Sequence, residues 1–285
     1  MLAYIKNVLK ANAVGIVWIF YAASRQSDAV ETTDATLSAS NVAILTRIAR
    51  ADHLLVEYRP LILVPSTPDH WEGLISPQDP AQWFQSYYEA ELPYLKRARQ
   101  LGVQEFVTAT EMHKLNISPL WRKFFVRVAK VYHGVISYAS WDVDYFSPDR
   151  YIPPVKYVGV NLYHRLHLPP DATAADVADD FDSLFSKEPV ALLRRTAIDE
   201  TGIQARAGAY LDPSNLEAPG QLDEQVQANW YTAVCSVVHR FHLRGVFFWK
   251  VDLTDYPAHP ATSLSTFEGK KGAAAITACA RTLLN

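Results

Sequence analysis

The sequence predicts one α/β domain, residues 1–285, folded as a (β/α)8 TIM barrel. The length of 285 residues suits such a barrel, which typically needs about 250. Strand-like and helix-like segments alternate along the whole chain, without a Gly/Ser linker or an internal repeat, as in folds with a parallel sheet. Polar and aromatic residues gather where the expected strands end, which is where barrels carry their active sites. A doubly wound sheet would use the same edge, but no glycine-rich phosphate loop follows the first expected strand.

Seven segments are expected to be strands, and the first of them is apolar on both sides, as parallel sheets require. They are 14–21, 54–64, 104–111, 135–139, 157–163, 196–200 and 245–251. An eight-stranded barrel therefore lacks one strand, and its place is before residue 1. A chain that begins late and a gap closed by some other element both remain open explanations.

Helices are expected between the strands, from apolar residues at helical spacing and from capping residues. The expected ranges are 2–12, 38–51 (or from 40), 79–101, 120–133, 171–185, 223–243 and 272–284. The longest opens with Asp79-Pro80 and stops at Gly102, a typical start and end. The polar loops 65–80 and 202–220 are long enough to indicate a function.

Residues 1–24 contain Lys6 and Lys10, then an apolar run from Ala13 to Tyr21, then small residues. This order is compatible with a signal peptide, but four bulky β-formers at 18–21 favour a helix followed by a buried strand. The run is too short to span a bilayer. We expect no membrane partner. The sequence does not decide between a cytoplasmic location and secretion by another route.

Composition excludes several classes of function. The formal charge is −3 and no long basic run occurs, which disfavours a nucleic-acid partner. Cys235 and Cys279 form no metal motif or disulfide framework, so we expect two buried thiols in preference to the alternative, a bridge between them. No cofactor and no metal are expected. His164 and His167 lack acidic partners, Asp142 and Asp144 lack the glycine and distal glutamate of a calcium loop, and no Gly-x-Ser-x-Gly elbow for acyl hydrolysis occurs.

Two expected strands end in a glutamate, Glu111 and Glu200. Glycoside hydrolysis needs such a pair: one carboxyl protonates the leaving oxygen, and the other attacks the anomeric carbon or activates water. The acid must stay protonated near neutrality, so its pKa has to be raised by burial or by a nearby anion. Each glutamate could instead be a salt-bridged residue at the rim of the barrel.

Other residues at the strand ends are candidates for the site. The Tyr163 phenol could hydrogen-bond Glu200, and Trp249 could form the floor of a sugar subsite. Arg59 lies within a strand and could pair with a carboxylate. The remaining candidates for sugar contacts are Trp141, Asp142, Asn161, His164, Trp71 and His70. Packing or peripheral roles stay open for all of these side chains.

Four blocks of sequence carry a resemblance to a known family. They are 70–73 (HWEG) with 79–84 (DPAQWF), 106–111 (FVTATE) with 119–122 (PLWR), 132–134 (YHG) with 137–142 (SYASWD), and 198–202 (IDETG) with 245–249 (GVFFW) and 269–270 (GK). From about residue 2 to its end, the chain resembles clan A glycoside hydrolases, most closely family 113, the endo-β-mannanase-like group.

The resemblance implies a carbohydrate substrate and a retaining mechanism. In the family the acid/base glutamate ends strand 4 and the nucleophile ends strand 7, which implies Glu111 and Glu200 in those roles if the missing strand is the first. Thr110 stands where many clan members have Asn, and the missing strand would leave one wall of the cleft without residues.

The resemblance favours β-mannan as the substrate. The alternatives are an exo-acting hexosidase or furanosidase (galactofuranosidase-like) of the same clan, and a non-catalytic glycan-binding barrel.

Overall fold

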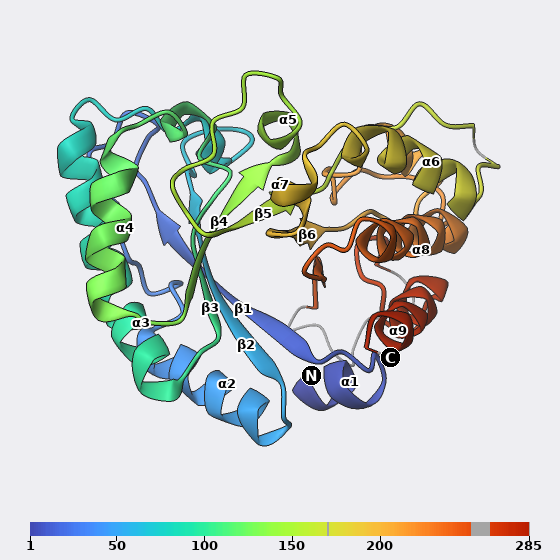
Figure 1. Ribbon diagram of the computed structural model, residues 1–285, viewed down its shortest axis with the longest axis horizontal. Coiled ribbons are helices and arrows are strands. Elements are labelled where there is room, and N and C mark those ends of the chain that lie inside the picture. Colours follow the sequence, from blue (N-terminus) through green and yellow to red (C-terminus); the bar gives the residue numbers. More distant parts are fainter. Residues whose placement is uncertain (170, 252–262, 285) are drawn as a thin grey trace. The chain divides into compact units, whose positions relative to one another are not determined.

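The computed structural model describes residues 1–169, 171–251 and 263–284, and its chain divides into two compact units (Figure 1). One unit holds residues 13–159, and the other holds residues 1–12 together with 160–285. The start of the chain is helix α1 (Leu2–Asn7) followed by strand β1 (Ala13–Tyr21), so the prediction of a helix and then a strand is confirmed. The helix is shorter than expected because Lys10 takes a positive φ of 60°, which no α-helix accommodates.

In the unit of residues 13–159, four strands pair in parallel and in chain order. They are β1, β2 (Leu55–Leu63), β3 (Glu105–Thr110) and β4 (Val135–Trp141). Three helices lie along the outer side of these strands (Figure 1): α2 (Ala39–Ala51), α3 (Pro80–Leu101) and α4 (Leu120–Val131). Helix α3 ends as predicted, with Gly102 left-handed at φ 61°, a conformation that glycine adopts without strain.

Aromatic rings form much of the core between these strands and helices. Trp18 of β1 stacks on Tyr94 of α3 with ring centroids 4.3 Å apart, and it meets Tyr58 and Phe106 edge-on. All four side chains are buried. Such aromatic pairs add stability beyond the apolar area that they bury, and here they fix helix α3 against three neighbouring strands.

Strand β5 (Tyr157–Asn161) contains the boundary between the units, and β6 (Thr196–Thr201) and β7 (Val246–Phe248) follow it in the sheet order. The second unit also contains helices α6 (Ala174–Phe185), α7 (Val190–Leu193), α8 (Glu224–Arg240) and α9 (Lys271–Leu283). Helix α8 packs against both α6 and α9 (Figure 1). The chain start joins this unit, since Thr277 Oγ1 of α9 donates to the Val8 carbonyl (3.2 Å).

The described residues thus form seven strands, and these are the seven that the sequence predicts. Helix α6 starts later than expected because Thr173 and Asp176 close a capping box at its first turn. Short helices α5 (Asp142–Tyr145) and α7, and the 3-10 turns η1 (Glu72–Leu74), η2 (His113–Leu115) and η3 (Ala209–Leu211), were not predicted, because they are too short to show a periodic pattern. Residues 252–262 of the expected loop 252–266 lie outside the described residues.

The expectation of two free thiols is wrong, because Cys235 of α8 and Cys279 of α9 form a disulfide with Cα atoms 5.5 Å apart. Both side chains are buried between the two helices. A spacing of 44 residues matches no framework that can be recognised from sequence. The pairing depends on the packing of α8 on α9, which the sequence alone does not reveal.

Removing this disulfide is expected to destabilise the protein. The Cys235→Ala/Cys279→Ala double variant should lose about 3–4 kcal/mol of unfolding free energy, because the bridge closes a long loop in the unfolded chain. Urea denaturation of the oxidised wild type and the variant measures the loss. A reductant should bring the wild type to the stability of the variant and leave the variant unchanged. Equal stability of oxidised and reduced wild type would contradict this prediction.

Helix α3 carries a carboxyl group that is completely shielded from solvent. Glu91 has 0% exposure, and burial raises its pKa well above the usual value, outweighing the opposing contact with Tyr87. The Tyr87 hydroxyl gives its own proton to the Thr108 carbonyl (2.8 Å). Glu91 is therefore neutral in the folded protein over a wide pH range.

The raised pKa of Glu91 makes stability depend on pH. Above about pH 4.5 the unfolded chain ionises this group while the fold keeps it protonated. Stability is then lost as pH rises toward the folded-state pKa, by up to about 1.4 kcal/mol per pH unit. Glu91→Gln should remove this slope. Urea denaturation at pH 5, 6, 7 and 8 measures it, with Glu89→Gln, an exposed change on the same helix, as the control. Equal slopes for wild type and Glu91→Gln would refute the prediction.

Candidate active site

Glu111 follows the last residue of β3 and adopts a strained backbone. Its φ is +52°, a left-handed conformation that costs a non-glycine residue on the order of 1–3 kcal/mol. Its N–H donates to the Ala139 carbonyl of β4 (2.8 Å), and its carbonyl accepts from the His113 N–H (2.6 Å). These bonds turn the chain out of the sheet at Glu111. Strain of this kind concentrates at functional sites.

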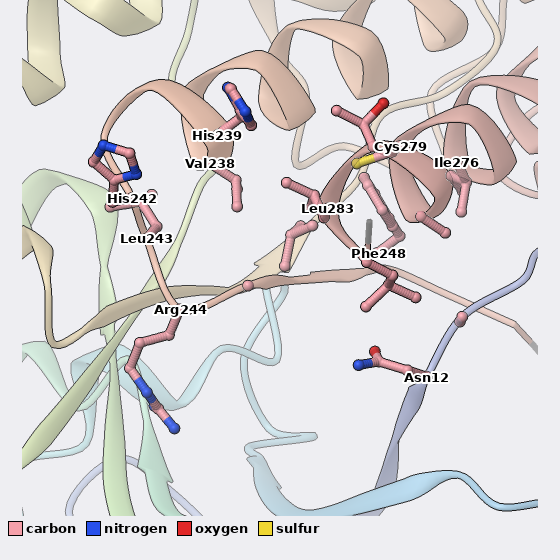
Figure 2. Close-up of a pocket in the computed structure, with 16 residues that line it drawn as sticks. Asn12, Val238, His239, His242, Leu243, Arg244, Phe248, Ile276, Cys279 and Leu283 are labelled. Carbon is pink, nitrogen blue, oxygen red and sulfur yellow. The ribbon is translucent and has the colours of Figure 1, made fainter.

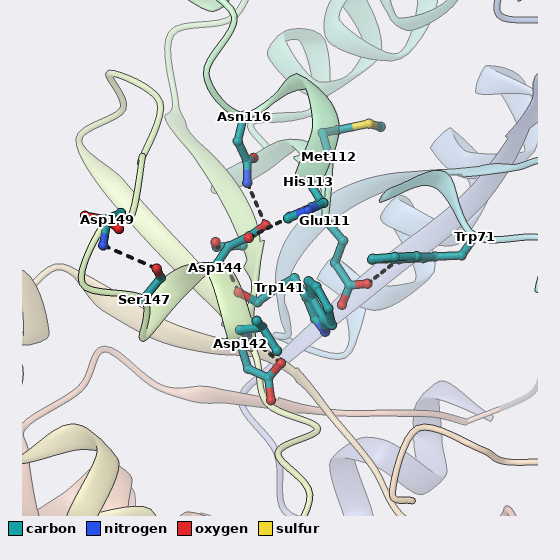
Figure 3. Close-up of polar contacts among 12 residues, drawn as sticks. Trp71, Glu111, Met112, His113, Asn116, Trp141, Asp142, Asp144, Ser147 and Asp149 are labelled. Atoms are coloured by element: carbon teal, nitrogen blue, oxygen red, sulfur yellow. Dashed lines mark hydrogen bonds and ion pairs between the residues drawn. The ribbon is translucent and has the colours of Figure 1, made fainter. Parts of the chain in front are cut away.

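The Glu111 carboxylate is held by an indole. Trp71 Nε1 donates to Glu111 Oε2 at 2.6 Å (Figure 3). The Trp71 ring meets Trp141 edge-on with centroids 5.0 Å apart, and Trp141 meets His113 in the same way at 5.6 Å. Trp71 and Trp141, both predicted as site residues, therefore lie beside Glu111.

A polar network fixes the chain just after Glu111. Asp144 of α5 accepts from Asn116 Nδ2 and pairs with His113 Nδ1, both at 2.7 Å (Figure 3). The Tyr138 hydroxyl hydrogen-bonds Asn116 and accepts from the Met112 N–H (3.2 Å). Burial, reinforced by the negative charge of Asp144, raises the pKa of Tyr138 well above its usual value, so this phenol stays a donor.

None of His113, Asn116 and Asp144 was predicted as a site residue. The position of His113, two residues after a strand-ending glutamate, is the signal that could have drawn attention to it. Asp142, which was predicted, is 2% exposed and accepts from the Val143 N–H (2.7 Å). It thereby satisfies a backbone donor in the first turn of α5. Its carboxylate and that of Asp144 have separate partners (Figure 3).

Glu200 lies in the other unit, near the end of β6, and its carboxylate is also held by an aromatic side chain. The Tyr163 hydroxyl donates to Glu200 Oε1 at 2.8 Å, so the predicted hydrogen bond is present. The backbone beneath is fixed by bonds from the Leu162 N–H to the Glu200 carbonyl (2.7 Å) and from Thr201 Oγ1 to the Leu162 carbonyl (2.8 Å). Trp230 Nε1 of α8 in turn donates to Thr201 Oγ1 (2.8 Å).

Trp249 follows β7 directly and lies against the end of β6. Its N–H donates to the Thr201 carbonyl (2.7 Å). A Cβ atom added to Gly202 would lie 2.6 Å from the Trp249 carbonyl oxygen, so only glycine permits this approach. Asn161, 1% exposed at the end of β5, and the partly exposed His164 belong to the same unit as Glu200 and Trp249.

Arg59 pairs with a carboxylate within β2, as predicted. Its Nη2 and Nε lie 3.0 and 3.2 Å from Glu57 Oε1, and both residues are 2% exposed. The two positions are two apart in a strand and so point to the same face of the sheet. A buried charge pair of this kind is tolerated because each partner compensates the other.

A cavity of about 490 Å³ lies elsewhere in the unit of residues 1–12 and 160–285 (Figure 2). It is lined by the end of α8, the start of β7 and helix α9, including His242, Val246 and Ile276. None of its lining residues in the described part of the chain carries a carboxylate, and the cavity extends along β7 from Gly245 to Phe248. The described lining therefore does not supply the carboxyl pair that glycosidic cleavage needs.

The described residues contain neither a metal-binding cluster nor a membrane-spanning helix. No group of three or more His, Cys, Asp or Glu side chains among them could hold a metal ion. None of the helices in that same part of the chain is long and apolar enough to cross a membrane.

Comparison with known proteins gives a family and a fold. The model of Glycoside Hydrolase Family 113 matches residues 2–270. A solved structure of a GH113 β-mannanase from Alicyclobacillus acidocaldarius in complex with ManMIm has 19% identity and a TM-score of 0.80, covering 99% of this chain and 91% of that one. A GH113 β-1,4-mannanase complex has 17% identity at the same coverage and TM-score. A fungal β-1,4-galactanase has 14% identity and a TM-score of 0.58, covering 98% and 90%. A search of curated protein sequences finds no match.

These likenesses confirm the predicted fold class. The similar structures are TIM-barrel glycoside hydrolases, and this chain supplies seven parallel strands in the part that the structure describes. The expected absence of one barrel strand agrees with that count.

Proposed function

This chain belongs to Glycoside Hydrolase Family 113 and is a glycoside hydrolase of clan A, and from that premise we propose that it cleaves β-mannosidic bonds with Glu111 as general acid/base and Glu200 as nucleophile. One observation carries the proposal. Each glutamate follows or ends a parallel strand, with its carboxylate oriented by an aromatic donor, Trp71 for Glu111 and Tyr163 for Glu200. Side chains fixed in this way are prepared for chemistry before a substrate binds.

The proposed reaction is a double displacement that retains the anomeric configuration. Glu111 protonates the departing oxygen while a Glu200 oxygen attacks the anomeric carbon, and a covalent glycosyl–enzyme forms. Glu111, now a carboxylate, then removes a proton from the water that cleaves the glycosyl–enzyme. The Tyr163 hydroxyl donates to Glu200 and orients its carboxylate. No cofactor takes part.

Seven side chains are proposed to bind the sugar. Trp249 would stack on a sugar face, since aromatic rings bury the apolar faces of sugars. The other residues proposed to bind substrate are Trp141, Asp142, Asn161, His164, Tyr163 and Trp71. A mannan substrate is supported by the similar structures, which are described as β-1,4-mannanases.

The stereochemistry of the first product tests the proposal. Proton NMR during hydrolysis of β-1,4-mannooligosaccharides should show the β-anomer first, with the α-anomer appearing later by mutarotation. Appearance of the α-anomer first would overturn the retaining mechanism.

A panel of aryl glycosides tests the substrate and should show turnover of β-mannosides. Turnover of furanosides alone would overturn the mannan assignment. Saccharide binding by calorimetry without any product would indicate a glycan-binding protein instead.

A further inference from the structure

The loop that carries Trp71 is clamped just before that residue. Asp69 Oδ1 accepts from Thr67 Oγ1 (2.9 Å) and from the Trp71 N–H (3.4 Å), and Asp69 Oδ2 pairs with Arg25 (2.7 Å). Burial acts to raise the pKa of Asp69, but these three donors outweigh it, and the pKa is lowered overall. Asp69 therefore stays ionised, and the loop is held on the side of the chain that enters Trp71.

The indole lies directly over the backbone that follows it. A Cβ atom added to Gly73 would lie 2.2–2.5 Å from three atoms of the Trp71 ring, far inside van der Waals contact. Any side chain at this position would push the ring away. Glycine at 73 therefore permits the ring orientation that delivers Nε1 to Glu111 Oε2.

The other side of the indole is also held. Trp141 meets it edge-on, and His113 meets Trp141. His113 is fixed by Asp144, 2.7 Å away. The Trp71 ring thus lies against the loop backbone at Gly73 and against Trp141. Trp141 in turn contacts His113, which is anchored to α5 through Asp144 (Figure 3).

From these contacts we infer that Trp71 is a positioning residue for Glu111, and that Gly73 acts through it. The indole N–H fixes the rotamer of the Glu111 carboxyl and stabilises its ionised form, which the second half of the reaction uses as a base. Trp71 takes no part in proton transfer itself. This inference rests on the proposed acid/base role of Glu111.

The pH dependence of Glu111 also involves other charged and titratable groups around it in the same unit. Those that lie in this region are Glu72, His113, Tyr138, Asp142 and Asp144 (Figure 3). All of them are retained in the variants proposed below, so a change in pH profile reports the loss of the indole bond.

The test is the pH profile of kcat/KM on β-mannooligosaccharides for Trp71→Phe. Phenylalanine keeps an aromatic ring and removes the N–H. A donor to a carboxylate favours its charged form, so losing the donor raises the pKa of Glu111 and keeps the acid protonated to higher pH. The alkaline limb should therefore move upward by about one pH unit. The acidic limb, set by Glu200, should stay in place.

Gly73→Ala provides an independent variant, since it keeps the indole and displaces it. It should move the alkaline limb in the same direction. The matched control is Trp121→Phe, which removes another indole hydrogen bond of this unit, to the Leu115 carbonyl (2.9 Å), and leaves the bond from Trp71 to Glu111 in place. The control should leave both limbs in place, and circular dichroism checks the fold of each variant.

The outcomes separate this inference from the proposed function. If Glu111→Ala keeps full activity, the proposed role of Glu111 fails. If Glu111→Ala is impaired while the alkaline limb is the same in wild type and in the folded Trp71 or Gly73 variant, the proposed function stands and the positioning role of Trp71 is overturned. A shift of similar size in Trp121→Phe would also overturn it.

Discussion

Replacing Glu200 with alanine is expected to lower kcat/KM on β-mannooligosaccharides by roughly 10⁴-fold or more, as losses of covalent nucleophiles do. The methyl side chain cannot attack the anomeric carbon, and no glycosyl–enzyme can form. Tyr163 then loses its acceptor, and the fold should survive, because the backbone bond between Leu162 and Glu200 does not involve the side chain. Initial rates and circular dichroism of the same preparation measure both properties.

Azide distinguishes loss of the nucleophile from general damage. The cavity left by Glu200→Ala admits a small anion, which attacks an activated aryl β-mannoside from the vacated face and gives the α-mannosyl azide. Tyr163→Phe is the control: it keeps the nucleophile and removes its 2.8 Å hydrogen bond, so activity should fall about 10- to 100-fold without response to azide. A β-mannosyl azide from Glu200→Ala, or undiminished activity, would show that another group attacks the sugar.

The strands and the two glutamates could be predicted because their signals are local. In the segment 104–111, Phe106 and Val107 suit the interior of a sheet and Glu111 ends the strand with a carboxylate, and both features lie within eight consecutive residues. The bond from Tyr163 to Glu200 could be anticipated since parallel strands end at one edge, so that residues following neighbouring strands come together. Side chains at strand ends thus follow from the fold class.

The remaining features depend on contacts between distant segments. Asp144 meets His113 across 31 residues, and the network arises only when α5 folds back onto the exit of β3. The disulfide likewise needs α8 and α9 in register. The sequence pattern of α3 would equally allow Glu91 to face solvent, and only the packed structure shows that this side chain is buried. These pairings are set by tertiary packing, for which a single sequence carries no periodic signal.

Replacing Glu111 with alanine is expected to have an effect that depends on the leaving group. For mannooligosaccharides, whose leaving alcohols need protonation, kcat/KM should fall about 10²- to 10⁴-fold, the usual contribution of general acid catalysis. For a 2,4-dinitrophenyl β-mannoside the leaving phenolate needs no proton, so the first step should stay close to the wild-type rate. The second step still needs a base, and a burst of dinitrophenol followed by slow turnover should result. Stopped-flow absorbance measures the burst and the steady rate.

The second step also identifies which glutamate is which. Azide needs no deprotonation, so it should accelerate the slow turnover of Glu111→Ala and give the β-mannosyl azide, formed by a second inversion at the glycosyl–enzyme. Glu200→Ala should instead give the α-mannosyl azide. The two variants therefore give azides of these opposite anomeric configurations only if the roles of the two glutamates are those proposed. Glu91→Gln, a change in another buried carboxyl of the same unit, serves as the control and should show neither a burst nor an azide response. An equal loss on both substrates for Glu111→Ala would mean that Glu111 supports the structure of the site without exchanging a proton.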